Sequence, residues 1–246
     1  MLHIRPAIFL PHHGITAAHS TRHGGVSPAP LGMNVSFRVG DHEAFVQENR
    51  KRFLRSVGMS ENLLAVPRQI HSATVRAVEW PGQLPDCDGL TTNVPGVVLS
   101  VTVADCLAIL LADPARGVVA AVHAGWRGTA SGIATRAVEL LQGHYGVHPA
   151  DLLVYLGPSA RACCYEVGED VASLFGDAVI RRDQKRYLDL AIANEQQLTR
   201  CGVSPGNIET SPDCTISHPE LYHSYRRDGG RSGRMMAVIG ILPLPA

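Results

Sequence analysis

The sequence predicts an α+β fold in which mixed β-sheets are flanked by helices. The chain has 246 residues, of which 45% are hydrophobic, enough to build a large buried core. Apolar runs of strand length are mixed with amphipathic helical stretches, without the strict strand–helix–strand alternation of a doubly wound fold. No internal repeat or domain boundary is visible, so we expect residues 1–246 to form a single domain.

The N-terminal third contains a strand, a loop and a helix. Ala17–Thr21 is a candidate strand that runs into the Gly- and Pro-rich loop Arg22–Pro28. Glu43–Val57 is predicted to be helical because its apolar side chains recur at helical spacing, and Gly58 follows as a C-terminal stop. Two short strands are expected on either side of Gln69–Ser72, at Leu63–Val66 and Thr74–Glu79.

Three apolar runs form the centre of the predicted core, at Val97–Ala104, Leu107–Ala112 and Val118–His123. The turn residues Asp113–Gly117 predict that the last two runs pair as a hairpin. Ser131–Tyr145 is then expected to be a helix with a buried apolar stripe, and Ser131 is a residue type that caps helix N-termini.

The C-terminal part is predicted to contain two strands and two helices. Asp151–Leu156 and Met235–Leu242 are the strands, and Glu169–Phe175 and Leu188–Cys201 are the helices. Gly202 directly follows the second helix, as expected at a helix C-terminus.

Composition also limits the class of partner. The 22 basic residues balance 22 acidic ones, so the overall charge suggests neither nucleic acid nor a membrane surface as a partner. No apolar segment approaches the roughly 20 residues of a membrane span, and nothing resembles a signal peptide. Among the six cysteines, the adjacent Cys163 and Cys164 are poor mutual disulfide partners and are expected to serve packing. We therefore expect reduced thiols and a cytoplasmic protein, while the oligomeric state remains open.

A thiol and an imidazole lie in or beside the apolar runs. Cys106 precedes one run and His123 ends the next, so both side chains can face one cavity if the strands pair. Such a pair suggests either a thiolate–imidazole nucleophile or a metal site, with His71 as a third ligand. The alternative is a small buried cysteine beside a hydrogen-bonded core histidine.

Several motifs together resemble the laccase-domain family, which is named for multicopper polyphenol oxidases but contains purine nucleoside phosphorylases and is also called the peptidoglycan editing factor family. The most specific motif is His123–Gly128, HAGWRG, which accompanies Asp105-Cys106 and Gln69–His71. The remaining motifs, in chain order, are Thr21–Ser27, Leu31–Asn34, Asp86–Thr91, Gly157–Ser159, Tyr165–Gly168, Ser224–Asp228 and Gly233–Met235.

The resemblance implies a metal bound by His71, Cys106 and His123, with these three also catalytic. It implies a mixed fold similar to the catalytic domain of cytotoxic necrotizing factor toxins, which pairs a cysteine with a histidine. It further implies zinc-dependent phosphorolysis of adenosine, inosine and S-methyl-5′-thioadenosine, together with deamination of adenosine. The substrates would therefore be a purine nucleoside and phosphate.

Two other activities follow from the same residues. A multicopper centre would need repeated His-x-His pairs, and this sequence has none, but the three ligands could bind one copper for polyphenol oxidation. Without a metal, Cys106 and His123 would form a cysteine hydrolase pair, and the resemblance implies that such a pair would act as an amidase that edits peptidoglycan precursors.

Substrate-binding residues are expected within the family-like motifs. Phosphate suits the planar fork of arginine, and the candidates are Arg22 and Arg227 first, then Arg127 and Arg226. Asn34 is a candidate to bind the sugar or the base, and Gln69 to contact the substrate or to hold His71. Asp88 and Asp105 are the candidates for proton transfer. Trp126 is expected in the core or in the wall of the pocket. Asp105 is the weaker proton donor, because neighbouring side chains on a strand face opposite sides.

Overall fold

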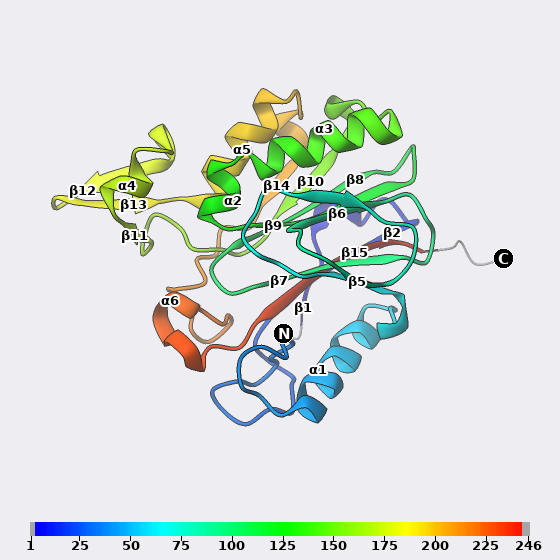
Figure 1. Ribbon diagram of the computed structural model, residues 1–246, viewed down its shortest axis with the longest axis horizontal. Coiled ribbons are helices and arrows are strands. Elements are labelled where there is room, and N and C mark those ends of the chain that lie inside the picture. The colour runs from blue at the N-terminus through cyan, green and yellow to red at the C-terminus, as the bar shows by residue number, and fades with distance from the viewer. Residues whose placement is uncertain (1–2, 243–246) are drawn as a thin grey trace.

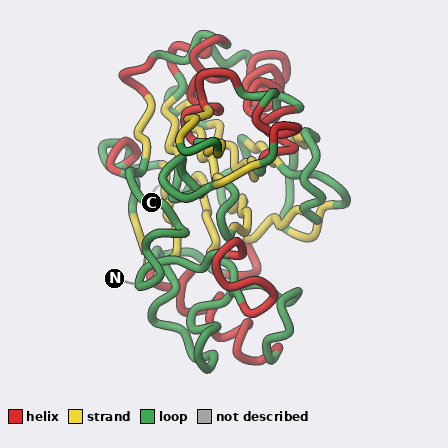
Figure 2. Tube along the Cα trace, turned by 90° about the vertical axis from the view of Figure 1, so that its left-hand side faces the viewer, coloured by secondary structure: helices red, strands yellow, loops and turns green. Residues whose placement is uncertain are grey.

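Two six-stranded β-sheets pack face to face, and helices cover both outer faces. The computed structural model describes residues 3–242. Figure 1 shows α3 and α5 over one sheet and α1 beneath the other, and Figure 2 shows the strands between these two helical layers. The α+β class with mixed sheets and flanking helices is confirmed.

Both large sheets mix parallel and antiparallel pairs. The first has the order β1 (His3–Ile4), β2 (Ile15–Ser20), β15 (Met235–Ile241), β7 (Val98–Val103), β3 (Leu64–Pro67) and β5 (Gly82–Leu84). The second has the order β14 (Ile208–Thr210), β10 (Leu153–Leu156), β8 (Leu107–Asp113), β9 (Val118–Ala124), β6 (Gly89–Thr92) and β4 (Val75–Ala77). A small outlying sheet contains β11 (Glu166–Val167), β13 (Lys185–Leu188) and β12 (Val179–Arg182).

The helices are α1 (Glu43–Ser56), α2 (Trp126–Ala130), α3 (Ile133–Tyr145), α4 (Glu169–Ala172), α5 (Leu190–Arg200) and α6 (Tyr225–Asp228). The long helices α1, α3 and α5 bury one apolar face each, as their sequence periodicity predicts. The hairpin predicted at residues 113–117 is also confirmed, because β8 and β9 pair antiparallel over their whole length.

Strand alternation divides the core into layers. In β8, Leu107, Ile109 and Leu111 pack under α3 and α5. The intervening residues Ala108 and Leu110 face the first sheet and form the core between the two sheets. A third apolar cluster joins α1 to the outer face of the first sheet. Burial on both faces explains why these strands are continuous apolar runs rather than alternating patterns.

Three predictions of helix boundaries were wrong. Ser131 does not cap α3: it ends the unpredicted helix α2, and Gly132, in the left-handed region at φ +77°, precedes α3. Leu188 belongs to β13, and α5 starts after Asp189, whose carboxylate accepts from the amides of Ala191 and Ile192. The helix predicted at Glu169–Phe175 ends at Ala172, because the chain tightens there into i→i+3 turns.

Two predictions from composition have counterparts in the described structure. None of the six cysteines, all within residues 3–242, forms a disulfide. No helix in the same range is long and apolar enough to span a bilayer.

The packing of α1 on the first sheet gives a stability prediction. Phe53 is fully buried in the α1 cluster, so Phe53→Ala should lower the free energy of unfolding by about 3–5 kcal/mol, as measured by urea denaturation. Phe37→Ala is the matched control, because that ring is 42% exposed and should cost no more than about 1 kcal/mol. Equal losses for the two variants would contradict this packing assignment.

Candidate metal centre and active-site cavity

Strand register brings Cys106 and His123 together. His123 on β9 lies opposite Ala108 on β8, and Cys106 comes two residues before Ala108. The two side chains are therefore diagonal neighbours on the face that looks toward the first sheet. His123 is almost fully buried, whereas Cys106 is partly exposed.

His71 reaches the pair from a strained loop after β3. Its φ is +62°, which is unusual for a residue with a side chain. The Asp88 carboxylate holds this loop by accepting hydrogen bonds from the backbone amides of Ile70 (3.2 Å), His71 (2.9 Å) and Ser72 (2.7 Å). The fixed loop directs the His71 ring toward His123, with 4.9 Å between the ring centroids.

Asp88 also orients His123. One of its oxygens lies 2.8 Å from His123 Nδ1, so that nitrogen carries the proton and Nε2 is left to face the cluster. The Asp88 side chain is completely buried. Burial raises its pKa, but the contacts with His123 and Ser72 outweigh burial and lower the pKa to about 2.

The three donor atoms of His71, Cys106 and His123 all lie within 4.8 Å of one another. This arrangement requires a glycine at position 125, where a Cβ would lie 2.9 Å from Cys106 Sγ and 3.1 Å from His71 Cδ2. Two imidazoles and one thiolate around a common point, with one side open, have the donors and the vacant direction of a catalytic zinc site. The hydrogen bond that His123 donates to the Asp88 carboxylate is typical of a histidine that binds zinc.

The thiol of Cys106 is strongly perturbed in the metal-free protein. Burial raises its pKa, but the neighbouring His123 and His71 outweigh burial and lower the pKa to about 6. The pKa of His123 is correspondingly raised to about 9, because Cys106 and Asp88 outweigh the opposing effect of burial. At neutral pH the metal-free pair is therefore a thiolate and an imidazolium.

A cavity of about 610 Å³ opens above the cluster, a size that suits a small-molecule ligand. Trp126 and two tyrosines, Tyr165 and Tyr225, form part of its wall. Sequence reasoning placed Trp126 as core or pocket wall but did not select the two tyrosines, although both lie within motifs that carried the family resemblance.

Four arginines line the cavity: Arg38, Arg127, Arg226 and Arg234. Aromatic rings support three of them, with Arg127 4.3 Å from the Trp126 ring centroid, Arg226 5.0 Å from Tyr165 and Arg234 5.4 Å from Tyr225. Arg127 and Arg226 were phosphate candidates from the sequence. Arg38 and Arg234 were not selected, and of these only Arg234 lies in a family-like motif.

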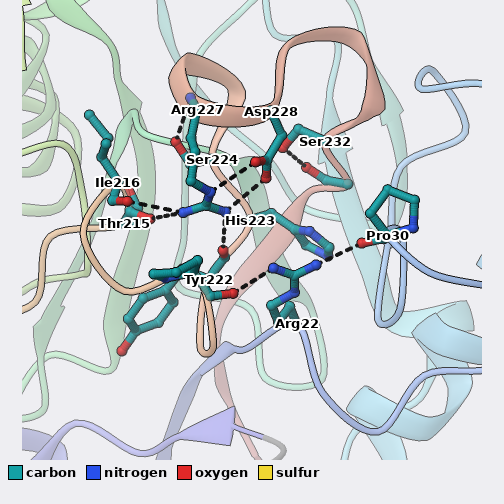
Figure 3. A network of polar contacts seen from close by, with 12 residues as sticks. Arg22, Pro30, Thr215, Ile216, Tyr222, His223, Ser224, Arg227, Asp228 and Ser232 are labelled. Carbon is teal, nitrogen blue, oxygen red and sulfur yellow. Dashed lines mark hydrogen bonds and ion pairs between the residues drawn. The ribbon is translucent and has the colours of Figure 1, made fainter.

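Arg22 and Arg227, the first phosphate candidates, lie in a neighbouring polar network (Figure 3). Arg22 donates to the carbonyl oxygens of Pro30 and Pro219. Arg227 forms a bidentate pair with Asp228 and donates to three carbonyl oxygens, those of Thr215, Ile216 and Tyr222. Neither arginine is among the described residues that line the cavity. Both guanidinium groups instead join loops of the wall.

Asn34 and Gln69 differ in their access to the cavity. Asn34 is fully buried, and its side-chain oxygen accepts from the amides of Ser36 and Arg234, two residues of the cavity wall. Gln69 lines the cavity, but its amide is engaged with the backbone and hydroxyl of Thr102.

Asp105 lines the cavity beside Cys106, contrary to the strand argument made against it. It lies outside the strands, between β7 and β8, and its φ of +81° removes the expected alternation. One carboxylate oxygen accepts from Thr215 Oγ1 (2.7 Å) and the other from the amide of Arg226 (2.6 Å), so Asp105 positions the start of α6.

Residues 16–242 match the family described as multi-copper polyphenol oxidoreductase laccase. A Deinococcus radiodurans protein named purine nucleoside phosphorylase is 39% identical over 96% of this chain and 93% of its own length. The Geobacillus stearothermophilus protein named purine nucleoside phosphorylase YlmD is 34% identical over 94% of this chain and 91% of its own.

Solved structures agree with these sequence matches. The crystal structure of YlmD from Geobacillus stearothermophilus superimposes with a TM-score of 0.89 at 34% identity, covering 95% of this chain and 94% of that one. The Bacillus licheniformis protein YfiH gives a TM-score of 0.88 at 32% identity and covers 93% of both chains.

The lowered pKa of Cys106 predicts that its thiol reacts with alkylating reagents at a lower pH than an ordinary cysteine does. In chelator-treated protein, the rate of Cys106 alkylation by iodoacetamide should rise with pH to a half-maximum near pH 6 and be flat above about pH 7. His123→Ala should move the midpoint upward by at least about 1 unit, toward an ordinary thiol at about 8.5. Cys201→Ala is the matched control and should keep the profile. A wild-type midpoint above about pH 8 would refute the thiolate assignment.

The lowered pKa of Asp88 predicts that Asp88→Asn lowers the free energy of unfolding by an amount that depends on pH. The native carboxylate titrates near 2 instead of its ordinary 3.8, so its stabilisation is present above pH 4 and is lost as pH falls through 2. Asp88→Asn should therefore cost about 2 kcal/mol of unfolding free energy at pH 7, with the difference shrinking between about pH 4 and pH 2. Urea titrations at several pH values measure this, with the exposed Asp151→Asn as control. A pH-independent difference would contradict the role of the charge.

Proposed function

This chain belongs to the multi-copper polyphenol oxidoreductase laccase family, and on that basis we propose that it is a purine nucleoside phosphorylase acting on adenosine, inosine and S-methyl-5′-thioadenosine. The names of full-length relatives at 34–39% identity support this choice within the family. The observation that carries the proposal is the cavity itself, in which four arginines and one cluster of His2Cys donors face a space of nucleoside size.

We propose that His71, Cys106 and His123 hold one zinc ion. Their donor set fits, because neutral imidazole and thiolate are the usual zinc ligands and Asp88 supports His123 from behind. When bound, the ion supplies a Lewis-acidic positive charge at the cavity floor. The same donors accept one copper ion. Within residues 3–242, this is the only His-containing group of three donors, so it provides far fewer histidines than a multicopper centre requires.

The arginines of the cavity would bind the phosphate. In phosphorolysis a phosphate oxygen attacks C1′ of the ribose while the glycosidic bond breaks and the purine leaves with the bond electrons. Arg127, Arg226 and Arg234 are held by aromatic faces, which orient each guanidinium without neutralising its charge. Three fixed forks around one pocket suit a dianion, because each fork can donate two parallel hydrogen bonds to phosphate oxygens.

Deamination of adenosine is a second activity that we propose for the same cavity. In this hydrolysis the oxygen of a water molecule bonds to C6 as the bond from C6 to the amino nitrogen breaks, and a nearby group must move a proton to the leaving ammonia. Asp105 is the only carboxylate among the described residues that line the cavity, whereas Asp88 is fully buried and engaged behind His123. We therefore assign the proton transfer to Asp105.

A thiol amidase acting on peptidoglycan precursors is the second candidate function. One observation favours it: without metal, Cys106 and His123 form a charged pair, and Asp88 orients the imidazole as the third member of a triad. Chelation separates the two functions, because it would abolish zinc-dependent turnover but would leave or increase thiol-dependent amide cleavage.

The decisive experiment incubates zinc-loaded protein with adenosine or inosine, with and without phosphate, and identifies the products. We expect phosphate-dependent release of adenine or hypoxanthine with ribose 1-phosphate, and ammonia from adenosine independent of phosphate. Cys106→Ala should lower both activities by at least about 100-fold, because a metal ligand is lost. Arg226→Gln should raise the KM for phosphate about tenfold or more with little effect on deamination.

Matched variants control these measurements. Cys201→Ala removes a thiol outside the cavity, and Arg136→Gln removes an exposed guanidinium on α3, so both should retain wild-type kinetics. Loss of deamination alone in Asp105→Asn would support its assigned role. Absence of any purine or ammonia from the zinc-loaded protein would refute the nucleoside proposal.

A further inference from the structure

A second group of three soft donors lies outside the cavity. The sulfur atoms of Cys163, Cys164 and Cys214 all lie within 4.8 Å of one another, although they come from two segments about 50 residues apart in the chain. Three thiolates bound to one ion at about 2.3 Å from each sulfur are about 4 Å apart, so this spacing needs little rearrangement to hold an ion. The sequence suggested only packing for the adjacent pair.

Packing does not account for this group. Cys214 is buried and Cys164 partly so, but Cys163 is exposed, and an exposed thiol gains little from apolar contact. The thiol of Cys87, which is buried and has no cysteine partner in such a group, lies by contrast inside the core between the two sheets. The exposure of Cys163 also provides a route by which an ion reaches the buried sulfur.

The two segments are held rigidly together. Arg161, two residues before Cys163, donates to the Asp189 carboxylate (2.8 Å) and to the Ser211 carbonyl (2.7 Å). A β-bridge pairs Ser159 with Cys214, and the amide of Thr215 donates to the Ser159 carbonyl at 3.0 Å. The donors are therefore preorganised, so binding of an ion would cost little ordering entropy.

Two arginines contact the backbone of the segments that carry the three cysteines. Arg182 donates to the Cys163 carbonyl at 2.6 Å. Arg161 adds a second guanidinium close by in the chain, although its charge is shared with Asp189. A d10 cation such as Zn²⁺ or Cu⁺ accepts thiolate ligands, whereas Mg²⁺ and Ca²⁺ require oxygen donors. The donor set therefore favours a soft cation.

We propose that Cys163, Cys164 and Cys214 form a second metal site, selective for a soft d10 cation such as Cu⁺ or Zn²⁺. Binding replaces the three S–H bonds by metal–sulfur bonds and releases the protons to water, with no change of oxidation state. The proposal is independent of the nucleoside activity, because it uses none of the residues assigned to the cavity.

The site would connect two parts of the cavity wall. Tyr165, which lines the cavity, directly follows the cysteine pair. Thr215, which directly follows Cys214, donates to Asp105 at 2.7 Å. A bound ion would therefore fix the positions of Tyr165 and Asp105 relative to each other.

The test uses full-length Cys106→Ala protein, in which the cavity cluster lacks its thiolate. Reduced protein is incubated with Zn²⁺ or, in a separate arm under reductant, Cu⁺, then desalted, and the bound metal is measured by elemental analysis. We expect one ion per chain in at least one arm, loss of that ion on adding Cys163→Ser or Cys214→Ser, and retention on adding Cys201→Ser. The ion should also protect Cys163 from alkylation.

Folding is checked by circular dichroism, and the exposed Cys163→Ser variant keeps the test valid if Cys214→Ser does not fold. Equal metal content with and without Cys163 and Cys164 would overturn the proposal. So would the absence of bound metal in both arms, or a thiol count showing that Cys214 is oxidised to a disulfide in the reduced preparation.

Discussion

The carboxylate of Asp88 is the interaction on which the candidate centre depends. It joins two separate parts of the fold, because one oxygen contacts the His123 ring on β9 while both accept amides from the loop that carries His71. A buried charge is stable only when hydrogen bonds compensate its desolvation, and here these bonds go to groups that orient the donors. The same contacts that stabilise the carboxylate therefore position the two imidazoles.

The sheet supplies the rest of the geometry. Cys106 and His123 share one face of adjacent strands, and their diagonal relation follows from the register of the hairpin. Gly125 leaves room for the sulfur and for the His71 ring, which a larger residue would displace. Because β8 and β9 are buried on both faces, the centre rests on a part of the molecule that resists local opening.

The wall of the cavity is organised around cations rather than carboxylates. Aromatic rings support three arginines, while Asn34 and Asp105 bind backbone amides that place Arg234 and Arg226. Arg22 and Arg227 belong to a layer behind this wall. Arg22 joins two distant parts of the chain by donating to Pro30 and Pro219, whereas Arg227 joins nearby segments by donating to Thr215 and Tyr222. The inner arginines therefore give the pocket its positive charge, and the outer arginines hold the loops behind them in place.

Local patterns in the sequence determined the class of fold and most helices and strands, whereas the family-like motifs indicated the three residues whose donor atoms converge. Strand alternation and helical periodicity are short-range properties, so residues 107–112 and 118–123 predict their own pairing and the face on which His123 lies. Tertiary structure alone decided which arginines face the cavity, since a long side chain follows its hydrogen-bond partners, and those of Arg22 include Pro219. It likewise placed Asp105 at the cavity, because the left-handed backbone of this residue breaks the strand alternation. It also brought Cys214 next to Cys163 and Cys164.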